Sequence, residues 1–161
     1  MSDYVLRIIP MDQDYIPSAE AQQIAVAQLK EMLPDGEMCR AEAYDQLRFI
    51  DQGENGEAVL CPSCGKRFPI DPFTEHDPGV MWWLEVTESA MRGVEQLHTT
   101  TPCCRTQVPF TSLRFDWPAG IARFELSIWN TNAPDGLLTA EQLGRIEAIL
   151  GCRLMQIRAH Y

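Results

Sequence analysis

The sequence predicts an α+β fold, specifically a ferredoxin-like sandwich whose two halves flank an inserted module. Three observations support this prediction. Strand-like and helix-like segments follow one another as strand, helix, strand, and this order occurs twice. Between the two units lies a stretch of different character that carries two cysteine pairs. A chain of 161 residues is the size of one domain, so we expect a single domain over residues 1–161 with the insert at about 58–116.

The first unit is predicted from periodicity and from a helix cap. Residues 4–9 read as a strand that Pro10 stops. Ser18 is a good N-cap residue, and residues 19–33 after it place apolar side chains at helical spacing. Residues 44–50 alternate and predict the second strand.

The second unit has sharper local signals. Residues 121–129 (IARFELSIW) predict a strand. Residues 139–142 (TAEQ) form a capping-box sequence, which predicts a helix that continues to Leu150 and stops at Gly151. Residues 153–159 then predict the last strand.

The middle of the chain is predicted with one open alternative. Asp77 followed by Pro78 has the form of an N-cap with proline at the first helical position, which predicts a helix over 78–97. Residues 82–87 (WWLEVT) favour a strand by residue type. Residues 107–115 have strand character that Pro109 interrupts.

Two cysteine pairs carry the chemistry of the insert. The segment Cys61-Pro62-Ser63-Cys64-Gly65 has the form of a zinc knuckle, because two residues between thiolates let a tight turn direct both sulfurs at one ion. Glycine after the second cysteine allows the positive φ that the turn needs. The second pair is Cys103 and Cys104. The expected ligands of one zinc ion are Cys61, Cys64, Cys103 and Cys104.

The second pair is less regular than the first and leaves alternatives open. Adjacent cysteines can both bind one ion only if the backbone bends sharply between them, so His98 or His76 is a possible substitute for one thiolate. The other readings are a redox dithiol at Cys61 and Cys64 or unligated thiols. A redox dithiol usually begins a helix, and residues 67–72 (RFPIDP) after this pair cannot start one.

The charge of the chain bears on its partners. The formal net charge is -10, and the first 60 residues alone hold 12 acidic and 4 basic residues. A phosphate backbone repels such a chain, so we expect no nucleic-acid partner. A basic protein partner fits better.

The N-terminal residues and the cysteine pattern bear on location. Residues 1–15 contain no basic segment followed by an apolar run, and no stretch approaches the roughly 18 apolar residues that span a membrane. Four of the six cysteines lie in tight pairs, which favours metal over disulfides. These features predict a soluble, cytoplasmic chain without membrane contact.

Three segments resemble those of a group of small uncharacterised bacterial proteins. The group shares a CPxCG knuckle, a PCC knuckle and a YDWPAGFARF-like segment, which correspond here to residues 61–65, 101–104 and 112–124. The resemblance covers roughly residues 58–130 and departs from the shared pattern at Phe115, at Ile121 and at Arg105, where glycine is usual. The group brings no established activity, and its small acidic members are similar to immunity proteins of bacterial toxin systems.

A four-thiolate zinc site has no open coordination position, so it would stabilise the fold and not catalyse. No Ser/His/Asp order, phosphate loop or HExxH motif is present in the sequence. The first hypothesis is therefore a non-catalytic zinc-stabilised protein that binds another protein, specifically an immunity protein that neutralises a toxin encoded nearby. The alternatives are a zinc-ribbon regulator that binds nucleic acid, and a metal-dependent enzyme whose open site His76 or His98 completes.

Two groups of residues are candidates for the partner surface. Exposed tryptophans would supply lasting affinity, and Trp82 and Trp117 are the candidates. Acidic residues near the end of the first helix would steer a basic partner: Glu31, Asp35, Glu37 and Glu42.

Overall fold

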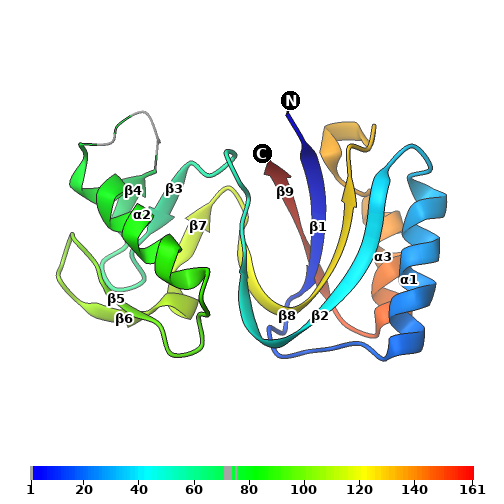
Figure 1. Ribbon diagram of the computed structural model, residues 1–161, viewed down its shortest axis with the longest axis horizontal. Helices are drawn as coiled ribbons and strands as arrows, with labels where there is room; N and C mark the ends of the chain where they lie inside the picture. The colour runs from blue at the N-terminus through cyan, green and yellow to red at the C-terminus, as the bar shows by residue number, and fades with distance from the viewer. Residues whose placement is uncertain (1, 71–73, 75) are drawn as a thin grey trace.

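The computed structural model describes residues 2–70, 74 and 76–161, and its fold is a mixed α+β arrangement of antiparallel sheets and helices (Figure 1). The largest sheet has four strands in the order β2-β8-β1-β9, and each neighbouring pair is antiparallel. These strands are β1 (Tyr4–Pro10), β2 (Glu37–Ile50), β8 (Gly120–Trp129) and β9 (Leu154–His160). Two helices, α1 (Ala19–Met32) and α3 (Ala140–Leu150), cover one face of this sheet (Figure 1).

The helix caps that the sequence predicted are confirmed. The Ser18 side chain accepts a hydrogen bond from the Ala21 amide at the start of α1. Thr139 and Gln142 form the reciprocal capping box of α3, and Gly151 ends that helix in the left-handed conformation. These short-range signals therefore fix where the two helices begin and where α3 ends.

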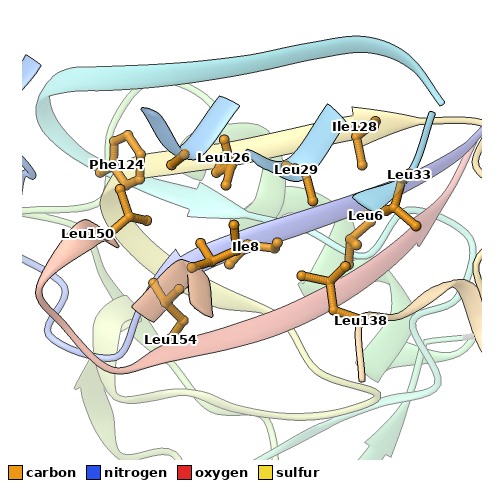
Figure 2. Close-up of a cluster of buried hydrophobic side chains, with 12 residues drawn as sticks. Leu6, Ile8, Leu29, Leu33, Phe124, Leu126, Ile128, Leu138, Leu150 and Leu154 are labelled. Carbon is orange, nitrogen blue, oxygen red and sulfur yellow. The ribbon is translucent and has the colours of Figure 1, made fainter. Parts of the chain in front are cut away.

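A first hydrophobic core lies between the sheet and the two helices (Figure 2). Alternate residues of β1 and β8 point toward the helices, which follows from the two-residue period of a strand. Figure 2 shows these side chains converging on those of α1 and α3 and on Leu138 and Leu154. The fully buried members include Leu6, Ile8, Leu29, Phe124, Leu126, Ile128, Ile146 and Leu150.

A second, smaller structure is formed by the middle of the chain. Strands β3 (Ala58–Leu60), β4 (Arg67–Pro69) and β7 (Arg114–Asp116) form a sheet in the order β4-β3-β7. Strands β5 (His98–Thr100) and β6 (Gln107–Pro109) form a separate hairpin. Helix α2 (Pro78–Ala90) and the short 3-10 turn Phe110–Ser112 complete this part, and a second 3-10 turn, Pro134–Gly136, precedes α3. We call residues 58–116 the cysteine module.

The cysteine module has its own core, which includes Trp83, Val86, Val94, Phe110 and Leu113. Leu47, Phe49 and Ile121 from β2 and β8 also pack into it. Register shifts in β2 between Ala43 and Arg48 bend that strand, so Ala41 packs against the first core whereas Leu47 and Phe49 pack into the second. The long strands β2 and β8 thereby join the two parts of the molecule (Figure 1).

Several predicted boundaries differ from the observed ones. The helix predicted over 78–97 ends at Ala90, and the chain then turns through Gly93, which has a φ of 136°. Residues 82–87 lie inside this helix, so the alternative of a strand there is wrong. The predicted segment 107–115 is split into β6, a 3-10 turn and β7. Strand β2 begins at Glu37, seven residues before the predicted start at 44.

The face of the large sheet opposite the helices carries a buried ion pair. Arg7 on β1 donates two hydrogen bonds to Glu125 on β8, at 2.6 and 3.1 Å, and Glu125 is only 4% exposed. Arg7 also bonds to Asp51 at 2.5 Å, and the Tyr44 hydroxyl donates to Glu125 at 3.0 Å. Burial, together with the carboxylates of Glu125 and Glu42, raises the pKa of Tyr44. A charged side chain within an apolar strand is the one sequence signal of this cluster.

Among the described residues, no helix has both the length and the apolar character needed to cross a lipid bilayer.

Candidate metal centre

The first cysteine pair lies in a tight turn between β3 and β4. The Cys61 amide donates to the Lys66 carbonyl, and the Gly65 amide donates to the Cys61 carbonyl, both at 2.9 Å. Gly65 has a φ of 76°, the left-handed conformation expected for the residue after the second cysteine. This turn brings Cys61 and Cys64 to the same side of the hairpin, as the predicted knuckle requires.

The second pair lies in a turn of the same geometry between β5 and β6. The Thr101 amide donates to the Thr106 carbonyl and the Arg105 amide to the Thr101 carbonyl, both at 3.0 Å. Arg105 has a φ of 54° and therefore occupies the place of Gly65. Residues 101–106 (TPCCRT) thus align position by position with residues 61–66 (CPSCGK).

This alignment explains the irregular spacing of the second pair. Cys104 is the structural equivalent of Cys64, whereas Thr101 stands where the first hairpin has Cys61. The missing thiol is supplied by Cys103, at the place that Ser63 occupies in the first hairpin. A proline stands at the second position of both six-residue segments, and this shared proline is the sequence signal that could have revealed the equivalence.

The two hairpins bring all four sulfur atoms together. Every pair among the ligand atoms of Cys61, Cys64, Cys103 and Cys104 lies within 4.8 Å. Sulfur separations are 3.8 Å for Cys61 and Cys104, 3.9 Å for Cys103 and Cys104, and 3.3 Å for Cys64 and Cys103. Two thiolates on a tetrahedral zinc ion, each at about 2.3 Å, are about 3.8 Å apart. The four cysteines therefore could hold one metal ion.

Two threonine hydroxyls, which no sequence motif had indicated, lie beside the sulfur of Cys104. The side chains of Thr101, at 3.4 Å, and Thr106, at 3.2 Å, lower the pKa of Cys104 to about 5. At Cys64, a hydrogen bond from the Lys66 amide also lowers the pKa. Contact with the Cys103 sulfur and the other thiols outweighs this effect and raises the pKa of Cys64 to about 11. Protons are thus shared unequally among closely spaced sulfurs, and a bound cation would displace them.

The histidines considered as substitute ligands are not members of the sulfur group. His98 begins β5, where its side chain is exposed and its Nδ1 lies 3.2 Å from the Gln96 carbonyl oxygen. His76 is exposed just before the Asp77 cap of α2. Within the described part of the chain, the group of candidate metal ligands consists of the four cysteines alone.

The remaining two cysteines are separate from this group. Cys39 on β2 and Cys152 after α3 are half-buried against the first core. Burial raises the pKa of both thiols, which makes them weak nucleophiles and weak ligands.

The redox alternative depended on the structure of the residues after the first pair. Strand β4 comes directly after the turn, so Cys61 and Cys64 do not begin a helix as redox dithiols usually do. Residues 71 and 72, the last two of the segment that the sequence excludes from a helix start, lie outside the described residues.

Arg105 gives a test of the equivalence between the hairpins. A residue other than glycine in the left-handed conformation costs about 1 kcal/mol, so Arg105→Gly should raise the free energy of unfolding by about that amount. Gly65→Ala is the matched opposite change, because its added Cβ meets no atom within 4 Å and only the backbone conformation is penalised. Denaturant unfolding should show a higher free energy of unfolding for Arg105→Gly and a lower one for Gly65→Ala than for the wild type. Loss in both variants would contradict the equivalence.

Comparison of the chain with protein-family models, with curated proteins and with solved structures finds no match.

Proposed function

We propose that this chain is a non-catalytic protein, stabilised by one zinc ion, whose function is to bind another protein. The proposal that the chain binds a metal ion rests on the convergence of four sulfurs from two equivalent hairpins. Ligation by all four thiolates leaves no coordination position for water or substrate, which supports a structural role for the ion. The proposed ligands are Cys61, Cys64, Cys103 and Cys104.

The donor set supports zinc in particular. Four thiolates in a tetrahedral arrangement are typical of zinc and of iron sites. Sulfurs that all lie within 4.8 Å of one another fit around a single ion and are too close together for a multi-iron cluster. Zinc is the usual single ion at two knuckles of this kind, and metal analysis distinguishes it from iron.

We also infer the finer architecture that the sequence predicted. The strand order β2-β8-β1-β9, built from two strand–helix–strand units, supports a ferredoxin-like sandwich. The position of residues 58–116 between those units, with a hairpin at each cysteine pair, supports a zinc-ribbon-like insertion.

The partner that we propose is a basic protein, with a toxin encoded nearby as the specific case. The net charge of -10 favours a basic partner and disfavours nucleic acid. Glu31, Asp35 and Glu37 are exposed around the end of α1 and the start of β2, and Glu42 follows on the same strand. A cytoplasmic location belongs to the same proposal.

Co-purification tests the proposed function. The chain, co-expressed with the protein encoded beside its gene, should elute with it as one complex and show no turnover of its own. Changing Glu31, Asp35, Glu37 and Glu42 to Lys should slow association, and the difference from the wild type should shrink as salt rises, because exposed charges act mainly on the encounter rate. Separate elution of the two wild-type proteins would rule out this partner.

A further inference from the structure

The tryptophans predicted as partner anchors are held by their own chain. The Trp82 indole nitrogen donates to the Thr99 hydroxyl at 2.7 Å, and the Trp117 indole nitrogen donates to the Arg158 carbonyl at 3.1 Å. The Arg158 guanidinium also lies over the Trp117 ring, 5.5 Å from its centroid. Neither tryptophan is among the large exposed apolar residues of the described chain, so the apolar part of a partner surface must be sought elsewhere.

Helix α2 exposes the clearest apolar stripe. Met81, Leu84 and Met91 are 51%, 52% and 78% exposed. Their spacing of three and seven residues places them along one side of the helix and its C-cap. We call these three residues the α2 stripe.

The α2 stripe is not needed to hold the helix. A neighbouring side of α2 carries Val80, Trp83, Val86 and Ala90, all buried in the module. A helix normally shows solvent a polar face, and α2 shows three large apolar side chains there beside its exposed glutamates. Figure 1 places α2 at the end of the molecule away from α1 and α3, where no described element covers it from outside.

Acidic side chains accompany the stripe. Glu85 and Glu88 are exposed beside it on the same helix. Glu88 pairs with Arg92 at 3.3 Å, but both side chains are at least 75% exposed, so this pair is weak and easily replaced. The rim of the stripe therefore favours a partner that carries Lys or Arg beside its apolar residues.

The stripe also leads to a recess in the surface. Ala90 and Met91 line a cavity of about 180 Å³, and its other walls are Arg7, Tyr44, Arg48, Phe49, Ile50 and Asp51. This cavity has room for one large apolar side chain, because its Asp51 carboxylate is already paired with Arg7. A partner helix that lies along α2 would thus find an apolar stripe, an acidic rim and a recess at one end.

We propose that the α2 stripe, with Glu85, Glu88 and the recess beside Met91, is the docking surface for an amphipathic basic helix of the partner protein, an inference that rests on the proposed protein-binding function. A helix whose apolar residues repeat every three and four positions matches the spacing of the stripe. A second copy of this chain fits less well, because pairing two stripes brings two acidic rims together.

A synthetic peptide tests the surface directly. The probe is a labelled helical peptide with leucines at every third and fourth position and lysines beside them, and fluorescence anisotropy measures its binding at physiological salt. The double variant Leu84→Ser/Met91→Ser should weaken binding by about tenfold or more, since central apolar contacts dominate affinity. Ile24→Ser on α1 is the matched control, because Ile24 is exposed to a similar degree, at 49%, and should leave binding unchanged.

Charge is tested with a second peptide in which glutamates replace the lysines. Its binding should be at least about tenfold weaker than that of the lysine peptide. Equal binding of the lysine peptide to the wild type and to Leu84→Ser/Met91→Ser, or an equal loss in Ile24→Ser, would overturn the docking surface. A wild-type dimer in sedimentation that the same double variant dissociates would also overturn it, because the occupant would then be a second copy.

The binding experiments distinguish an error in the proposed docking surface from an error in the proposed function. If the neighbouring gene product binds Leu84→Ser/Met91→Ser as tightly as the wild type, the protein-binding function stands and the α2 stripe is wrong. If no neighbouring protein binds while the lysine peptide still depends on the stripe, the surface stands and the specific partner is wrong.

Discussion

Replacement of Cys61 by Ser should abolish stoichiometric metal binding and lower the free energy of unfolding by several kcal/mol. Cys61 is the most buried of the four cysteines, at 3% exposure, and it begins the turn that positions Cys64. Because a structural metal site exists only in the folded chain, the free energy of metal binding contributes to folding. Metal analysis of protein purified without chelator should give one zinc per chain for the wild type and a value near zero for the variant.

The matched control is Cys152→Ser, which changes the same atom at a half-buried position outside the sulfur group. It should keep its zinc and nearly all of its stability. A chelator added to the wild type should reproduce the Cys61→Ser unfolding curve, because both remove the ion. Unchanged zinc content and melting temperature in Cys61→Ser would rule out a structural metal site in this fold.

The elements that the sequence predicted best have strong local signals. Ser18 and Thr139 begin helices by accepting hydrogen bonds from amides three residues away, so the information lies in nearby residues. The strands predicted over residues 4–9 and 121–129 are long and mostly buried, so their residue types alone identify them as strands. The order of two strand–helix–strand units followed from these local signals alone.

The cysteine module was harder to predict because its structure depends on distant contacts. Strands β3, β4 and β5 have three residues each, too few for a period of two to be recognised. Helix α2 was extended to residue 97 because Val94 and Leu97 continue its apolar spacing, whereas both pack into the module core from the turn after the helix. An apolar pattern at helical spacing can thus continue past the end of the helix.

The four cysteines could be selected from their spacing, but their arrangement could not. Spacing alone left open whether adjacent cysteines can share one ion, and His98 or His76 remained possible substitutes. The answer lies in the hairpin geometry, in which Arg105 takes the left-handed conformation and Cys103 takes the position of Ser63. That all four bind a metal remains a prediction, which the Cys61→Ser experiment tests.

The ion pair of Arg7 and Glu125 leads to the second large prediction. The two residues are 118 positions apart in sequence and meet only when β1 pairs with β8, so no local sequence pattern predicts the contact. Their side chains are 16% and 5% exposed, and the two parallel hydrogen bonds orient both groups. Desolvation of both charges is offset only while both partners are present.

Glu125→Ala should therefore lower the free energy of unfolding by about 3 kcal/mol, because the largely buried Arg7 guanidinium then keeps only the more exposed Asp51 carboxylate as an ionic partner. The double variant Arg7→Met/Glu125→Leu should recover most of that loss, since two apolar side chains of similar size remove the incompletely paired guanidinium and leave only Asp51, which is 40% exposed, without its cation. Glu141→Ala breaks an exposed pair with Arg145, in which Glu141 is 79% exposed, and should cost less than about 0.5 kcal/mol. Denaturant unfolding of the four proteins measures all three differences. A double variant as unstable as Glu125→Ala would mean that the loss comes from packing on this face of the sheet, not from the guanidinium that has lost Glu125.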